Sequence, residues 1–334
     1  MDQFSAHLDR GWDLAQRGDS RGAELSARRA LEIDGQSPEA FNLLGYVAAL
    51  KGEFDEAIEH YRQAIALDDT YLEAMLNAAE VYIHPLADFD EAVSMCDQAL
   101  DLVESDDELV DALLLKFDAL LGRSEIDEAR ELCRRFPGGP FENASHTFLV
   151  GRAFYEIGDM ERATPLIEEA VKTSPTNPEA FYYLGLVRDE RGDVRAATEA
   201  FLKSRELDLH LPAPAWSLSA EAFAMSAKRA VASLDAQFLG HIREDEVFVA
   251  EVPGVEVVVD GVDPRALLLL DGATLENGSS ATARVIVYQR NVERLAGSLE
   301  LIEPEIRAAL EREISATFIE PLERDKAIER GQLN

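Results

Sequence analysis

The sequence predicts a mainly α-helical protein, with a superhelical solenoid of about six helix pairs followed by a small α+β domain. Glycine and alanine recur at a fixed spacing through the first part of the chain, which is typical of stacked repeats. After Asp208 this spacing stops and dense β-branched runs appear, which indicates strands. A chain of 334 residues is long enough for two or three domains, so both parts can fold around cores of their own.

Four units share one pattern of small residues. A glycine is followed seven residues later by a second glycine, and an alanine follows five residues after that. The pattern occurs at Gly11, Gly18 and Ala23; at Gly45, Gly52 and Ala57; at Gly151, Gly158 and Ala163; and at Gly185, Gly192 and Ala197. The two copies in each neighbouring pair lie 34 residues apart.

Each unit is expected to be a helix (helix A), a tight turn and a second helix (helix B). The first glycine lets the two helices approach closely, and the second ends helix A in a left-handed conformation. An acidic residue follows the second glycine, as at Asp19 and Glu53, and it favours the start of helix B.

This pattern resembles the tetratricopeptide repeat (TPR). Two weaker copies fill the middle of the chain, one with Phe89–Ala92 and Ala99, the other with Ile126–Ala129 and with Phe117 at the small position. The resemblance covers about residues 4–211 and assigns 1–211 to the array. The expected units are 4–37, 38–71, 72–106, 107–140, 144–177 and 178–211.

The resemblance implies a concave face lined mainly by helix A, where a partner's segment would bind. The side chains expected there are Leu8, Trp12, Asn42, Tyr46, Leu76, Phe148, Arg152, Tyr155, Tyr182 and Leu186, with Glu80 beside them. Aromatic and aliphatic groups prevail, which favours an apolar protein or peptide as the partner. The acidity of the array favours a basic partner, or alternatively only keeps the helical surface soluble. Asn42 stands alone, so the lysine and asparagine pattern of chaperone-tail clamps is absent. Alternatively, these aromatic side chains pack between repeats or against the C-terminal domain.

The period changes beyond the array. Residues 212–218 contain two prolines and are expected to form a hinge. The domain at 219–334 should begin with a helix over about 219–236. Its further expected elements are strands at 247–250, 255–259 and 284–288, a buried segment at 267–270, a loop at 276–282 and a helix over about 301–330.

The order of these elements, with the stretch VIVYQRNVE at 285–293 before the final helix, resembles the small bacterial zincin-type metallopeptidase domain. That family carries H-E-I-x-H-H-F-G on its final helix, where two histidines hold zinc and the glutamate activates water. Here Arg312, Glu313 and Ala316 occupy the matching positions, so both histidines are replaced. The resemblance therefore implies an inactive domain without a metal site. The alternative is coincidence in an ordinary amphipathic helix.

Composition narrows the function further. The chain has 65 acidic and 32 basic residues and a net charge of −33, which argues against binding to nucleic acid or anionic membranes. It lacks an apolar run of about 18 residues and a secretory signal, so a cytoplasmic protein is expected. The resemblance to the bacterial metallopeptidase domain implies a bacterial-type protein. Cys96 and Cys133 are expected to be buried thiols. Nucleotide-binding motifs are absent, and we expect no cofactor.

The sequence thus predicts a non-enzymatic interaction scaffold, whose C-terminal domain is a second docking surface or a cap on the solenoid. Two other functions stay open. One is a metallopeptidase that recruits substrate through its repeats and uses residual ligands such as Glu313. The other is a structural assembly protein that associates with itself.

Overall fold

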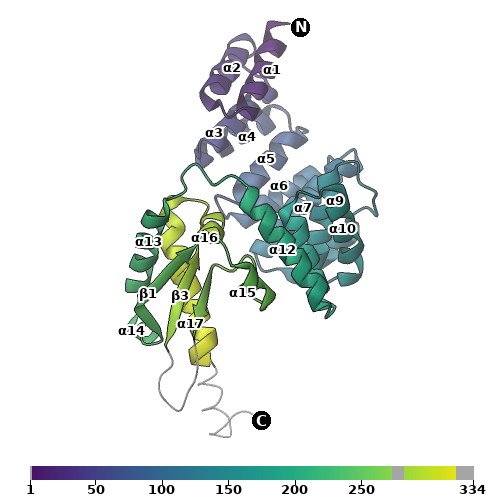
Figure 1. Cartoon of the computed structure of the whole chain (residues 1–334). Helices are drawn as coiled ribbons and strands as arrows, with labels where there is room; N and C mark the ends of the chain where they lie inside the picture. The colour runs from purple at the N-terminus through teal and green to yellow at the C-terminus, as the bar shows by residue number, and fades with distance from the viewer. Residues whose placement is uncertain (1, 273–281, 321–334) are drawn as a thin grey trace. The chain divides into compact units, whose positions relative to one another are not determined.

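The computed structural model describes residues 2–272 and 282–320 of the chain (Figure 1). The chain divides into two compact units, Met1–Pro175 and Thr176–Asn334. The second unit therefore begins one helix pair earlier than the hinge that the sequence predicts at 212–218.

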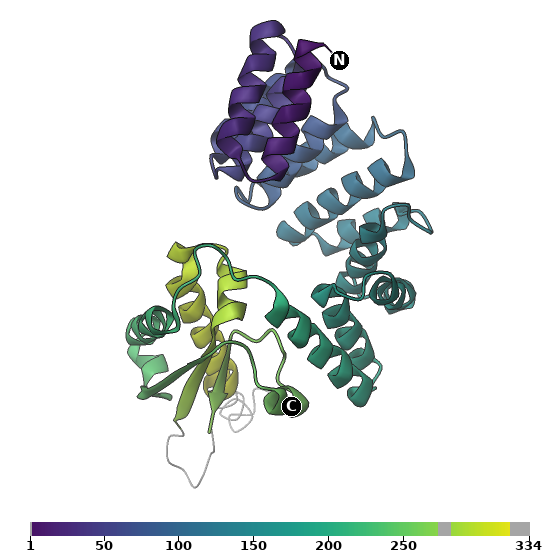
Figure 2. The ribbon, with the colours of Figure 1, turned by 45° about the horizontal axis from the view of Figure 1, so that its top comes forward.

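The first unit consists of helical hairpins, as the repeat pattern predicts. Its elements are α1 (Gln3–Gln16), α2 (Ser20–Ile33), α3 (Pro38–Leu50), α4 (Phe54–Leu67), α5 (Leu72–Ile83), α6 (Phe89–Leu100), α7 (Asp106–Gly122), α8 (Ile126–Leu132), the 3-10 turn η1 (Cys133–Arg135), α9 (Ala144–Glu156) and α10 (Met160–Thr173). Odd-numbered helices are helix A and even-numbered ones are helix B of each repeat. Figure 2 shows the pairs side by side.

The turns inside the hairpins have the expected left-handed residue. Gly18 and Gly52 have φ of 78° and 77°. The two weaker repeats keep this geometry without glycine, because Ala87 and Ser124 adopt φ of 50° and 61° at the same turn. The turn is therefore conserved between repeats as a backbone conformation even where the residue changes.

The acidic residue after each turn also caps helix B with a side-chain hydrogen bond, but only where it is aspartate. The Asp19 carboxylate accepts a hydrogen bond of 2.9 Å from the Gly22 amide and so caps α2. Glu53 stands at the same place before α4 without a side-chain cap. The longer glutamate side chain is not among the preferred N-cap residues.

The first glycine of each repeat allows close helix contact, as expected. A Cβ atom placed on Gly45 would lie 2.5 Å from the ring of Tyr61, which is buried in α4. Any side chain at this position would have to displace the ring, because real carbon atoms do not approach so closely.

The second unit joins one helical hairpin to an α/β domain. Its elements are α11 (Pro178–Glu190), α12 (Val194–His210), α13 (Ala220–Ala232), α14 (Ala236–Leu239), β1 (Ile242–Ala250), α15 (Val255–Val259), β2 (Leu268–Asp271), β3 (Ala283–Tyr288), α16 (Gln289–Ala296), η2 (Leu299–Leu301), α17 (Ile302–Ile314) and a π-helical turn η3 (Ser315–Ile319).

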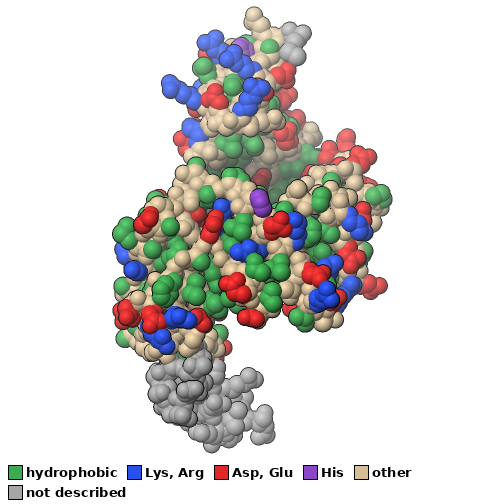
Figure 3. Space-filling model, in the orientation of Figure 1, with side chains coloured by type: hydrophobic (Ala, Val, Ile, Leu, Met, Phe, Trp, Pro, Cys, Tyr) green, Lys and Arg blue, Asp and Glu red, His purple; other side chains and the backbone are tan. Residues whose placement is uncertain are grey.

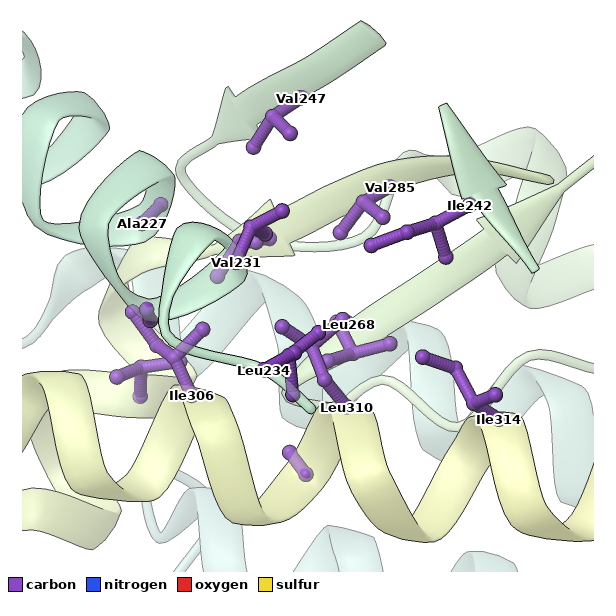
Figure 4. Packing of buried hydrophobic residues seen from close by; sticks show 14 of the residues in the cluster. Ala227, Val231, Leu234, Ile242, Val247, Leu268, Val285, Ile306, Leu310 and Ile314 are labelled. Atoms are coloured by element: carbon purple, nitrogen blue, oxygen red, sulfur yellow. The ribbon is translucent and has the colours of Figure 1, made fainter. Parts of the chain in front are cut away.

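The strands form a three-stranded sheet in the order β1-β3-β2. β3 pairs parallel to β1 and antiparallel to β2, so Phe248, Ile286 and Leu269 lie side by side on one face. The opposite face packs against α13 and α17, with Phe223, Val285 and Ile306 among the fully buried side chains (Figure 4). The core of the domain thus lies between one sheet face and two helices.

The predicted strand at 255–259 is wrong, because Val255–Val259 forms the short helix α15. Hydrogen bonds close locally, with the Val258 amide donating to the Gly254 carbonyl at 3.1 Å. Only Val258 is buried, and none of the strands in residues 2–272 and 282–320 pairs with these valines. Local hydrogen bonding and burial therefore override the strand preference of valine.

The other predicted elements of this domain differ from the observed ones mainly in their ends. The helix expected over 219–236 divides into α13 and α14, and the strand expected at 247–250 begins earlier, at Ile242. The expected loop at 276–282 and the end of the last helix beyond residue 320 lie largely or wholly outside the described residues.

Candidate functional site

The clearest candidate site in the first unit is an aromatic pair on neighbouring helices A. Trp12 of α1 and Tyr46 of α3 have ring centroids 5.2 Å apart at an angle of 55°. Both rings are half-buried and pack, with Leu8, against a core of Ala15, Leu43 and their neighbours. Their accessible parts form a contiguous apolar surface across two repeats, which is what a partner's side chain could contact.

Asn42 is placed beneath this surface rather than on it. Its side chain is fully buried, donates to the Tyr71 hydroxyl at 3.2 Å and accepts from the Asn77 amide at 3.0 Å. These bonds join α3 to the start and the middle of the next helix A. Asn42 therefore positions its neighbours, since its side chain is fully buried and both of its polar atoms already bond to the next helix A.

Two further predicted residues are held by the protein itself. Arg152 of α9 places one guanidinium nitrogen 3.0 Å from both carboxylate oxygens of Asp118 on α7. Phe148 is only 5% exposed and lies in the core. Leu76 and Tyr155 are half-buried, and Glu80 is exposed. Accessible apolar side chains among the predicted set of this unit are therefore Leu8, Trp12, Tyr46, Leu76 and Tyr155.

Sequence reasoning missed a buried histidine of this unit that contacts two aspartates. His146, 1% exposed, places Nδ1 3.1 Å from Asp107 and Nε2 2.8 Å from Asp111. The two carboxylates thus hold the imidazole from both of its ring nitrogens. The available clue was spacing, because these aspartates lie 39 and 35 residues before His146, which is close to one repeat.

In the second unit, Tyr182 is covered by the chain's own α/β domain. Its hydroxyl donates to Asp263 at 2.8 Å, and the Arg265 guanidinium lies 4.5 Å from its ring centre. Arg265 also pairs with Asp208 at 3.4 Å, and Arg294 pairs with the same carboxylate at 2.9 Å. Leu186 is half-buried on the same helix. The position that the sequence assigns to a partner is therefore occupied by residues 263–265.

The segment expected to be a hinge is anchored at both ends in this unit. Arg290 donates to the Leu211 carbonyl at 2.8 Å. At the other end Gln289 donates to the Leu218 carbonyl at 2.8 Å, and the buried Glu293 carboxylate accepts from the Leu218 amide at 3.1 Å. The segment passes from α12 to α13 over the α/β domain (Figure 2).

Removing the Tyr182 hydroxyl is expected to weaken the second unit without affecting partner binding. Tyr182→Phe should lower the free energy of unfolding by about 1 kcal/mol, because it loses one hydrogen bond. A double-mutant cycle with Asp263→Ala measures the coupling energy between the two side chains, with unfolding monitored by the fluorescence of Trp216. Additive effects of the two substitutions would contradict the contact.

The predicted zinc-helix positions do not fit a zinc ion. The Arg312 guanidinium is cationic and lies 3.3 Å from Glu313, while Ala316 has no donor atom. His241 stacks on Phe318 with ring centroids 5.0 Å apart. Across residues 2–272 and 282–320, no three histidine, cysteine or carboxylate side chains come together as a metal site would require.

The two cysteines are free and buried, as expected. Burial raises the pKa of the Cys96 thiol to about 12 and has the same effect on Cys133. Thiols that stay protonated near neutral pH are poor nucleophiles. Within the described part of the chain, no helix combines the length and the apolar run needed to cross a membrane.

Charged side chains are distributed unevenly over the face shown in Figure 3. Basic groups gather over the N-terminal hairpin, where Arg10, Arg21 and Arg29 are exposed on α1 and α2. Elsewhere acidic side chains are spread over the surface, in keeping with the net charge of −33.

Comparison with known proteins agrees with the hairpin architecture. A family model described as tetratricopeptide repeat matches residues 8–71 and 148–208, and a second model of the same description matches residues 74–110. No curated protein matches the chain. Neither family model extends into residues 219–334.

Solved structures show the same repeat fold. The chain is similar to PilF of Pseudomonas aeruginosa, with 19% identity over 63% of this chain and 93% of that one and a TM-score of 0.54. It is also similar to PilW, a type IV pilus biogenesis factor, with 16% identity over 63% of this chain and 96% of that one and a TM-score of 0.53. At these identities the likeness concerns the fold alone.

Proposed function

Because this chain contains tetratricopeptide repeats, which generally form protein-interaction scaffolds, we propose that it is a non-enzymatic scaffold that binds a partner's segment through helices A of its first unit. The observation that carries the proposal is the Trp12–Tyr46 pair, whose rings are half-buried and lie on two neighbouring repeats. Rigid aromatic side chains in such positions are enriched among the residues that dominate binding energy.

The α/β domain is proposed to be a degenerate zincin-like domain retained for binding. The replacement of both helix histidines by Arg312 and Ala316 supports this reading. The second docking surface would be the row formed by Phe248, Ile286 and Leu269, on the sheet face opposite the core, where Phe248 is 51% exposed. Stoichiometric zinc in the purified protein, lost on Glu313→Ala, would favour the peptidase instead.

Affinity capture from the source cell, with mass spectrometry of the captured proteins, tests the scaffold proposal. The bait is the full chain, compared with the same chain carrying Trp12→Ala and Tyr46→Ala. We expect a partner of the wild-type bait to be lost from the variant, because two hot-spot side chains together account for about 30-fold or more in affinity.

A matched control distinguishes this effect from a general loss of apolar surface. Leu25→Ala with Ile33→Ala removes two exposed apolar side chains from α2 and should leave capture unchanged. Circular dichroism verifies that all variants stay folded. Equal capture of every partner by the wild type and by the variant with Trp12→Ala and Tyr46→Ala would contradict the proposal that these two side chains bind the partner.

A further inference from the structure

A cavity of about 660 Å³ opens beside the predicted helix A residues of the first unit. Its floor is apolar and is made of Leu72, Leu76 and Leu102. These leucines are half-buried and pack against the core residues Met75, Ala99 and Ala112. The floor is therefore a fixed part of the repeat stack.

The rim of the cavity is acidic. Glu73, Glu104 and Glu108 line it, and no lysine or arginine does. Glu108 is engaged in capping α7, since it accepts from the Glu104 amide at 2.8 Å and from the Ser105 amide at 3.1 Å. Glu73 and Glu104 are exposed, and Glu73 accepts a hydrogen bond of 3.5 Å from the Tyr71 hydroxyl.

Tyr71 lines the same cavity beside Glu73. Burial raises the pKa of its hydroxyl first, and the charges of Glu73 and Glu39 raise it further. The same hydroxyl accepts the hydrogen bond from Asn42, which lies one helical turn from Tyr46 on α3. Tyr71 thus links the cavity to the helix that carries Tyr46, and Leu76 belongs both to the cavity and to the predicted contact residues.

An apolar floor under uncompensated carboxylates suits a side chain with an aliphatic stem and a cationic end. Lysine and arginine have this form, and their stems lie along apolar surface while the charge stays near water and acceptors. An acidic segment would be repelled, and a neutral apolar one would bury part of the rim without compensating its charge.

We propose that this cavity binds a lysine or arginine side chain of the partner's segment, in the same segment that contacts Trp12 and Tyr46. The inference rests on the proposed scaffold function and adds the chemistry of the partner. The partner's segment is then both basic and apolar. The charged end of its lysine or arginine lies between Glu73 and Glu104, and the aliphatic stem of that side chain lies on the three leucines.

Fluorescence anisotropy with labelled heptapeptides tests this inference on the full chain. The probe alternates leucine and lysine, and matched probes replace each lysine with arginine, glutamine or glutamate. We expect both basic probes to bind about tenfold or more tightly than the glutamine probe, and the glutamate probe to bind most weakly.

Charge-removing variants then locate the site. Glu73→Gln with Glu104→Gln should weaken binding of the lysine probe about five- to tenfold, because two partly exposed ion pairs are lost. Asp55→Asn with Glu59→Gln removes the same charge from exposed positions on α4, outside the cavity, and should change binding by less than about twofold.

The outcomes separate this inference from the scaffold proposal. Equal weakening by both variant pairs would show general attraction to an acidic protein and would overturn the cavity site. No weakening by the Glu73, Glu104 pair, while Tyr46→Ala still abolishes partner capture, would overturn the cavity site alone. If capture and probe binding are both independent of Trp12 and Tyr46, the scaffold proposal and the cavity site fail together.

Discussion

Replacing Phe223 with alanine is expected to lower the free energy of unfolding of the second unit by about 3–5 kcal/mol. Phe223 lies on α13, is completely buried, and is among the largest side chains of the core between the sheet, α13 and α17. Truncation removes apolar contacts and leaves a cavity that close-packed neighbours can fill only in part.

The two tryptophans allow each unit to be followed separately. Trp216 packs against the core that contains Phe223, while Trp12 belongs to the first unit. Denaturant unfolding of a Trp12→Phe background therefore reports the second unit through Trp216. The control Met225→Ala, on the same helix but exposed, should cost less than about 0.5 kcal/mol. Equal costs for the two substitutions would contradict the packing.

Removing the carboxylate of Glu293 is expected to cost the second unit about 2–3 kcal/mol. Glu293 is 2% exposed and accepts from the Ser217 hydroxyl at 2.8 Å, the Leu218 amide at 3.1 Å and the Gln289 amide at 2.8 Å. Glu293→Ala leaves these donors, which lie on half-buried residues, without their acceptor. The decrease in the free energy of unfolding should be larger than for an exposed glutamate, because donors beside an exposed side chain can form hydrogen bonds with water instead.

Trp216 directly precedes the anchored residues and reports their release. We expect Glu293→Ala to shift its emission toward that of a solvent-exposed indole and to lower the unfolding midpoint. Glu221→Ala, at an exposed position early in α13, serves as the control. Unchanged Trp216 emission together with an unchanged midpoint would contradict the anchoring contact.

The helical hairpins could be predicted from the sequence because their determinants are local and repeat. In the four clear repeats, the second glycine stands where the turn requires a left-handed backbone, and the first stands where the two helices approach closely. Each glycine therefore marks a place in the hairpin. Ala87 and Ser124 show that the same turn also forms without glycine. In the two weaker repeats, which lack these glycines, alanines and acidic residues at the matching positions indicate the hairpin instead.

The placement of the candidate site residues depended on contacts that are distant in sequence. The phase of helix A gave the side from which Asn42 projects, but its burial depends on Asn77 and Tyr71 of the next repeat. Tyr182 could not be assigned because Asp263 and Arg265 come from another part of the second unit.

The predicted strand at 255–259 failed for a related reason. β-branched residues favour strands only where a neighbouring strand accepts their hydrogen bonds. Here the segment is not one of the strands of the described β1-β3-β2 sheet, and it closes its bonds within α15. Local composition carried no information about that topology.

Site-specific photo-crosslinking tests most directly whether the first unit binds a partner through helices A. A benzoylphenylalanine in place of Tyr46 is compared, in the source cell, with the same group in place of Glu59 on α4 and of Phe248 on β1. A partner crosslinked strongly from position 46 and weakly from position 59 is the expected result. Crosslinks from 59 or 248 but none from 46 would contradict it.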